Sequence, residues 1–114
     1  MVISGDDPIT LQMIAAGAEG LVSVVANAYP KDYSDMVRLC LEGKFEEAQK
    51  LHYKYTDIIT SMFAEGSPSG VKAYLAEMGI CKNTFRLPVW KVSDKHHSKI
   101  KELMKKAQSV FLQY

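Results

Sequence analysis

The chain has 114 residues, a hydrophobic fraction of 47% and a formal net charge of +1 at pH 7. This length holds one domain or part of one, and the hydrophobic fraction suits a packed core, which excludes a disordered tail. With 14 basic and 13 acidic residues, the chain lacks the charge excess that captures nucleic acid or an anionic membrane surface.

A strand, a helix and a second strand are predicted in the first 30 residues. The apolar run at residues 1–4 stops at residues 5–8, where Asp7 is suited to cap a helix and Pro8 to be its first residue. A helical spacing of apolar residues follows, and residues 21–25 then form a β-branched run that is apolar on both faces. This order predicts a βαβ unit whose parallel strands are buried on both sides and need neighbouring strands at each edge.

Only helices are predicted from residue 30 onward. An apolar stripe over residues 33–41 predicts one helix, which Gly43 ends, and the stripe over residues 44–65 predicts the longest helix. A shorter helix ends at Gly79, and Ser93 is placed to cap the last helix. The apolar positions of that last helix are Ile100, Leu103, Met104, Ala107 and Phe111.

The cysteines and histidines follow no metal-binding pattern. Cys40 and Cys81 are far apart and lack CxxC spacing, so we expect reduced thiols. His96 and His97 are adjacent and would point to different sides of a helix, so we predict no metal site, and no cofactor is implied. No apolar run approaches the roughly 18 to 20 residues of a membrane span, and no basic segment of a signal peptide is present, so we expect a cytoplasmic protein.

The two junctions between a predicted strand and its following loop are the most informative feature. Glycine lets a backbone approach a ligand closely, and the start of a helix offers unpaired N–H groups to an anion. On the local residues alone, a plain turn and helix cap is the favoured interpretation of Gly5, Asp6 and Asp7, and a core position is the simple interpretation of Val22.

Four segments resemble, in order, the 4-hydroxy-tetrahydrodipicolinate synthases, also called dihydrodipicolinate synthases, which are pyruvate-dependent lyases. These segments are Ser4-Gly5-Asp6-Asp7, residues 20–27 (GLVSVVAN), residues 64–72 (AEGSPSGVK) and Arg86-Leu87-Pro88. The resemblance implies an α/β fold of the (β/α)8 or TIM barrel class, which needs about 250 residues when complete. It therefore implies a C-terminal fragment, with the last two strand units at residues 1–30 and the final barrel helix and C-terminal helical region at residues 31–114.

The resemblance also implies roles for individual residues. In this family the glycine matching Gly5 borders the pyruvate pocket, and the residue matching Val22 contacts pyruvate through its backbone carbonyl. Asp6 and Asp7 would hold the loop and cap its helix. Ser67 stands where the family usually has an asparagine that helps to hold the pocket together, so it is a candidate for pocket support.

No catalytic residue is assigned in this chain. The family forms a Schiff base between pyruvate and a lysine of the preceding strand, which these 114 residues do not include. Lys72 and Lys91 do not match that lysine, and we expect them to be solvated. The complete enzyme condenses pyruvate with aspartate semialdehyde on the route to diaminopimelate and lysine. The chain alone is predicted to be inactive and to associate with the missing barrel half or with itself as a homo-oligomer.

Two alternatives are open. The N-acetylneuraminate lyases share the barrel and the Schiff-base chemistry but use other aldehydes, and the Ser-Gly-Asp-Asp segment favours the synthases over them. Residues 41–51 resemble half of a tetratricopeptide repeat, which would favour a non-enzymatic helical interaction module. That pattern occurs once, whereas such solenoids need about three or more copies.

Overall fold

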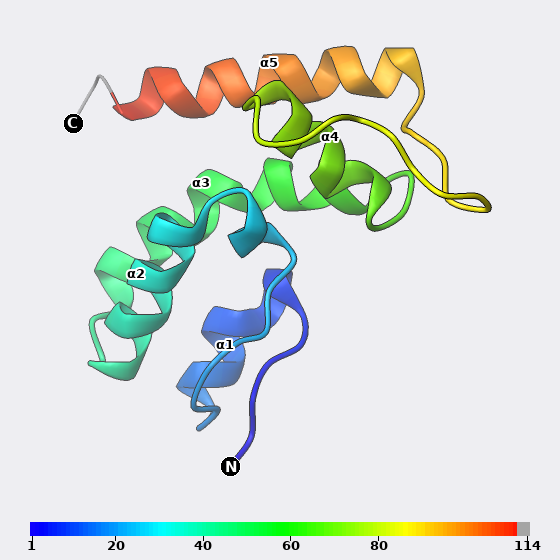
Figure 1. Cartoon of the computed structure of the whole chain (residues 1–114). Helices are drawn as coiled ribbons and strands as arrows, with labels where there is room; N and C mark the ends of the chain where they lie inside the picture. The colour runs from blue at the N-terminus through cyan, green and yellow to red at the C-terminus, as the bar shows by residue number, and fades with distance from the viewer. Residues whose placement is uncertain (112–114) are drawn as a thin grey trace. The chain divides into compact units, whose positions relative to one another are not determined.

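The computed structural model describes the backbone of residues 1–111 and the side chains of residues 1–108. Helices are its only regular elements over these residues (Figure 1). They are η1 (Asp7–Ile9), α1 (Thr10–Ala15), η2 (Val25–Asn27), α2 (Pro30–Leu41), α3 (Phe45–Phe63), α4 (Ser69–Glu77) and α5 (Asp94–Phe111), where η marks a 3-10 helix. The chain forms two compact units, residues 1–56 and the part from residue 57 onward, which divide inside α3.

The two predicted strands are reduced to one parallel bridge between Ser4 and Leu21. The Ser4 N–H donates to the Gly20 carbonyl at 2.9 Å, and the Val22 N–H donates to the Ser4 carbonyl at 2.9 Å. The parallel direction is therefore confirmed, but the continuous strand over residues 21–25 is wrong, because η2 begins at Val25. Burial on both faces is also wrong, since Val22 is 74% exposed. A parallel strand is maintained by neighbours on both edges, and the described residues supply only one.

The helix predictions after residue 30 are confirmed in number and order. Helices α2 and α4 are each followed by a glycine in the left-handed region, Gly43 with φ of +77° and Gly79 with φ of +74°. Tyr33 and Cys40 on α2 are buried as expected, but Leu41 at the end of that helix is 52% exposed. The side chain of Phe111, predicted on the apolar face of the last helix, lies outside the described residues.

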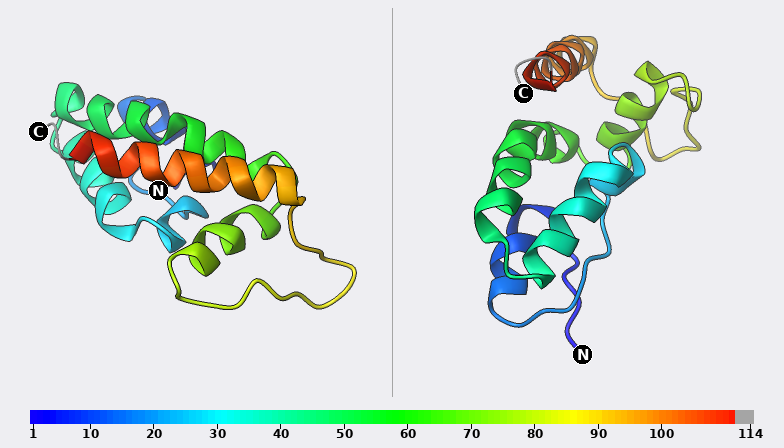
Figure 2. Two further views of the ribbon diagram at one scale, coloured as in Figure 1. Left: turned by 90° about the horizontal axis from the view of Figure 1, so that it is seen from above. Right: turned by 90° about the vertical axis from the view of Figure 1, so that its left-hand side faces the viewer.

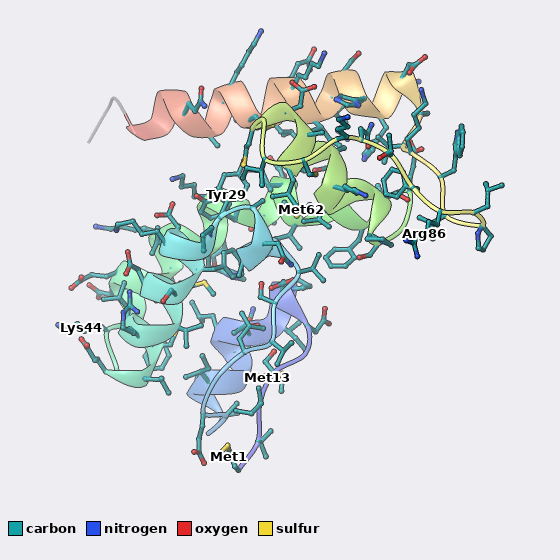
Figure 3. All side chains as sticks on the ribbon, in the orientation of Figure 1. Met1, Met13, Tyr29, Lys44, Met62 and Arg86 are labelled. Carbon is teal, nitrogen blue, oxygen red and sulfur yellow. The ribbon has the colours of Figure 1, made fainter. Side chains whose placement is uncertain are left out.

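In the first unit, α2 packs against α1 and η2 (Figure 2), and three tyrosines join the beginning of α2 to the middle of α3. The Tyr55 ring lies 4.8 Å from the Tyr29 ring and 5.7 Å from the Tyr33 ring, centroid to centroid. Figure 3 shows Tyr29 at the beginning of α2 and Lys44 at the turn from α2 to α3. The aromatic rings therefore fill the end of this helix pair that is remote from the turn.

A buried ion pair fixes the same two helices. Asp32 on α2 accepts hydrogen bonds from the Lys54 amine at 3.0 Å and from the Tyr55 hydroxyl. The side chains of Asp32 and Lys54 are only 14% and 9% exposed. Burial, and secondly the bond to Asp32, raises the pKa of Tyr55 above its ordinary value. A slip of α2 along α3 would separate Asp32 from Lys54 and leave each charge without its partner in a largely buried position. Because that is costly, this cluster holds α2 and α3 in one register.

The buried hydroxyl of Tyr33 gives a first testable prediction. Among the described residues it has no hydrogen-bond partner, and burial, followed by the charge of Asp7, raises its pKa. Tyr33→Phe is expected to leave the free energy of unfolding unchanged or to raise it by up to about 1 kcal/mol, because an unpaired buried polar group is costly. Urea unfolding followed by circular dichroism measures this. The matched variant Tyr55→Phe removes a bonded hydroxyl and should lose about 1.5–3 kcal/mol. A similar loss in both variants would contradict the prediction.

In the second unit, α4 packs against α5, and polar contacts tie both to the end of α3. The Ser61 hydroxyl shares a 2.5 Å hydrogen bond with the Tyr74 hydroxyl, and His96 Nε2 lies 2.7 Å from the Ser61 carbonyl. Ser93 caps α5 as predicted, because its hydroxyl accepts the His96 N–H at 3.2 Å. The Ser93 N–H and hydroxyl donate to Glu65 at 2.9 and 2.7 Å, and these bonds lower the pKa of Glu65.

Candidate functional site

The two loops of interest meet at the parallel bridge in the first unit. Gly5 follows Ser4 and Val22 follows Leu21, so both residues leave the same end of the bridge. The first loop is fixed from within: the buried hydroxyls of Ser4 and Thr10 lie 3.0 Å apart, and Thr10 donates to the Asp6 carbonyl at 2.9 Å. These short-range bonds hold Gly5 in place although it has no side chain.

Asp7 joins the first loop to the second. Its side chain is 2% exposed and accepts hydrogen bonds from the Ser23 hydroxyl, from the Val24 N–H at 3.0 Å and from the Val25 N–H at 3.2 Å. The prediction that Asp7 caps a helix is therefore wrong. Asp6 takes the N-cap position with an extended backbone, and its side chain makes no capping bond. The carboxylate of Asp7 is used for a contact between loops because the three donors of residues 23–25 converge on it.

Gly5 and Val22 both have open surroundings. A Cβ built on Gly5 would meet no atom within 4 Å, and Val22 is 74% exposed. The Val22 N–H is bonded to the Ser4 carbonyl at 2.9 Å, whereas its own carbonyl accepts no hydrogen bond from the described residues. The bridge thus leaves an accessible glycine beside a carbonyl that is available to accept a hydrogen bond.

Of the residues singled out from the sequence, the structure brings Gly5, Asp6, Asp7 and Val22 together. Ser67 belongs to the second unit, where it is exposed in the turn between α3 and α4. Gly66, directly before it, has φ of +96°. Ser67 as pocket support stays a prediction from the sequence.

The sequence interpretation missed Ser23. Its hydroxyl donates to Asp7 and also accepts the Ala26 N–H at 2.9 Å, so it is both a donor and an acceptor. A signal was present, because Ser23 is the only polar residue in the apolar run at residues 21–25. A hydroxyl within such a run needs a partner, and the first loop of the predicted βαβ unit offers the acidic candidates Asp6 and Asp7.

Among the other polar candidates, Lys72 and His97 have structural partners and Lys91 is solvated. The Lys72 amine donates to the Thr84 carbonyl and lies 4.7 Å from the centre of the Phe85 ring, so it braces the connector between α4 and α5. Lys91 is exposed, and His97 lies 2.6 Å from Glu77. In the part of the chain that the structure describes, no three His, Cys, Asp or Glu side chains are grouped for a metal ion. None of the described helices is long and apolar enough to cross a membrane.

Comparison with known proteins assigns the chain to a family of enzymes. Residues 1–107 match the model of the dihydrodipicolinate synthetase family. Over 94 residues the chain is 50% identical to the 4-hydroxy-tetrahydrodipicolinate synthase of Flavobacterium psychrophilum, which covers 82% of this chain and 32% of that relative. The chain belongs to the dihydrodipicolinate synthetase family.

Solved structures of synthases have the same fold over most of the chain. Dihydrodipicolinate synthase from Aquifex aeolicus matches with a TM-score of 0.90 and 38% identity, over 94% of this chain and 36% of that one. The chloride-inhibited dihydrodipicolinate synthase from Acinetobacter baumannii, complexed with pyruvate, matches with a TM-score of 0.90 and 30% identity, over 94% of this chain and 37% of that one. The chain spans about a third of the length of the relatives that it matches.

Proposed function

We propose that this chain is the C-terminal part of a cytoplasmic (β/α)8-barrel lyase that condenses pyruvate with aspartate semialdehyde through a Schiff base, in the biosynthesis of diaminopimelate and lysine. Three findings support the proposal: the family match, a relative that carries the synthase name, and a structural neighbour complexed with pyruvate. The observation that carries it is that Gly5 and Val22 each follow a residue of the parallel bridge, at the same end of it. In such barrels the active site is built at the carboxyl ends of the strands.

The chain's own residues would bind and orient pyruvate. Gly5 gives the ligand access to the backbone, because no atom lies within 4 Å of the position that a Cβ would take. The Val22 carbonyl would contact the bound pyruvate. Asp7 would hold the loops together, Asp6 would border them, and Ser67 would support the pocket. The amine that attacks the ketone would come from a strand outside these residues, so the chain alone would be inactive.

The chain's exposed apolar residues support association with further barrel strands. Val2 and Ile3 are 60% and 42% exposed in the segment that carries the bridge, and Val22 is 74% exposed in the other. In a complete barrel, these segments would be covered by neighbouring strands and helices. An isolated chain would cover them by forming a homo-oligomer, because open edges and apolar faces promote association.

The alternatives have less support. An N-acetylneuraminate lyase-like aldolase would use the same barrel, but the relative at 50% identity is a 4-hydroxy-tetrahydrodipicolinate synthase. The helical interaction module rests on residues 41–51, which in this structure comprise the last residue of α2, the turn that follows and the start of α3. The successive helices α2, α3, α4 and α5 have 12, 19, 9 and 18 residues, which is unlike a regular repeat.

A mass measurement tests the proposal directly. The purified chain is incubated with pyruvate and borohydride, which reduces a Schiff base to a stable adduct, and is then weighed intact. We expect no adduct, because Lys72 is bonded to a backbone carbonyl, Lys54 is ion-paired, and the family lysine is not in this chain. An adduct on the isolated chain would show an activated lysine within it and would contradict the assignment.

A chimera supplies the complementary result. Residues 1–107 of this chain would replace the matching segment of the Aquifex aeolicus synthase, whose structure they resemble with a TM-score of 0.90. The chimera is expected to form the pyruvate adduct and to consume aspartate semialdehyde. A chimera that folds, as judged by circular dichroism, and forms no adduct would overturn the proposed function.

A further inference from the structure

We propose that Ser23, acting with Asp7, is a positioning residue that sets the direction of the Val22 carbonyl and thereby determines the affinity for pyruvate. The inference rests on the proposed function, because it concerns the same site. It adds a residue with no assigned role so far, and it gives Asp7 a purpose beyond holding the fold.

Hydrogen bonds hold the backbone on both sides of the Val22 carbonyl. Before it, the Val22 N–H donates to the Ser4 carbonyl at 2.9 Å. After it, the Ser23 hydroxyl donates to one oxygen of Asp7, and the N–H groups of Val24 and Val25 donate to the other at 3.0 and 3.2 Å. The peptide group between Val22 and Ser23 thus has fixed neighbours in both directions, and its carbonyl orientation is set before any ligand arrives.

The burial of Asp7 and the occupied oxygens of both side chains separate this contact from direct binding. Asp7 is 2% exposed and both of its oxygens are occupied by donors of residues 23–25, so it does not reach a ligand itself. The Ser23 hydroxyl has already used its only hydrogen on Asp7, and it also accepts the Ala26 N–H at 2.9 Å. Val22, in contrast, is 74% exposed. The buried Asp7 and the half-buried Ser23 therefore act through the backbone on the exposed group.

The loss of the Ser23 hydroxyl should therefore affect pyruvate more than the second substrate. Without it, Asp7 keeps two backbone donors but no longer holds the residue that follows Val22, and the peptide gains freedom to rotate. We expect the KM for pyruvate to rise roughly ten-fold in Ser23→Ala, because small misplacements of a binding group are costly. The KM for aspartate semialdehyde should change less than about two-fold, since the change is local to the pyruvate carbonyl.

The test uses the chimera with the Aquifex aeolicus synthase and three substitutions. Ser23→Ala removes the hydroxyl, Ser23→Thr keeps it and should restore the pyruvate KM, and Ser34→Ala removes an exposed hydroxyl of α2 that accepts from Arg38 at 2.7 Å. Both KM values, kcat and the melting temperature are measured for each. Ser34→Ala should match the parent in all of them. If the Ser23→Ala chimera is too unstable to assay, Ser23→Cys keeps the side-chain volume with a weaker donor and gives the same comparison.

The outcomes separate this inference from the proposed function. A folded parent chimera without a pyruvate adduct would overturn both. An active parent with an unchanged pyruvate KM in Ser23→Ala would overturn the role of Ser23 alone. Equal increases of both KM values, or a Ser23→Thr variant as impaired as Ser23→Ala, would show a general structural effect and would also overturn it.

Discussion

Asp7→Ala is expected to lower the free energy of unfolding by about 3–5 kcal/mol, because a buried carboxylate with several donors would be lost at once. The substitution leaves the Ser23 hydroxyl and the N–H groups of Val24 and Val25 without their acceptor. Each unpaired buried donor costs about 1–3 kcal/mol, and partial access of water to the relaxed loops reduces the sum. Urea unfolding at a fixed chain concentration measures the loss, since self-association would otherwise shift the midpoint.

The neighbouring residue offers a matched control for Asp7. Asp6 carries the same charge one position earlier, but it is exposed and its side chain makes no capping bond. Asp6→Ala should therefore stay within about 0.5 kcal/mol of the parent chain. Losses of similar size in the two variants would mean that net charge, rather than the bonds of Asp7, governs stability.

Gly70→Ala is expected to have the second large effect, in the other unit. A Cβ on Gly70 would lie 1.8 Å from the carbonyl oxygen of Met62 and 2.5 Å from its carbonyl carbon. Backbone atoms cannot rotate away as a side chain would, so α4 must separate from the end of α3. We expect a loss of about 3 kcal/mol or more, or failure of this unit to fold.

The direction of the stability change in Gly70→Ala is informative because two effects oppose each other. Helix propensity alone favours alanine over glycine by up to about 1 kcal/mol, so a helix without this contact would gain stability. Gly5→Ala is the control, since no atom lies within 4 Å of the added carbon and the backbone is not left-handed. The melting temperatures of both variants show whether the clash with Met62 or the helix propensity is the larger effect. A Gly70→Ala chain that melts at or above the parent would show that α4 does not approach Met62 so closely.

The helices were predictable from the sequence because their signals are local. The stripe through Tyr33 and Cys40 and the two closing glycines lie within the elements that they specify. The strands were not predictable in the same way, since Ser4 and Leu21 pair over a single bridge and longer pairing needs neighbours from elsewhere. Local patterns report what a segment prefers, and strand length depends on what lies beside it.

The site shows the same division between local and distant information. Gly5 and Val22 were both identified through a family resemblance, because the local residues alone favour a plain turn and a core position. The role of Asp7 was misjudged, since a helix cap and a contact between loops use the same carboxylate. What distinguishes them is the position of donors 16, 17 and 18 residues away. No pattern within one loop contains that information.

The chemistry of the donors to Asp7 predicts that positions 23, 24 and 25 of the second loop differ in the substitutions that they tolerate. Two of the three donors are main-chain N–H groups, which every residue except proline carries. Positions 24 and 25 are therefore free to exchange side chains of suitable size, with proline the one forbidden choice. Position 23 is confined to hydroxyl-bearing residues, and position 7 to a short acid. If residues 23–25 are randomised and folded variants are selected, position 23 should therefore retain the fewest residue types, although all three positions donate to the same carboxylate.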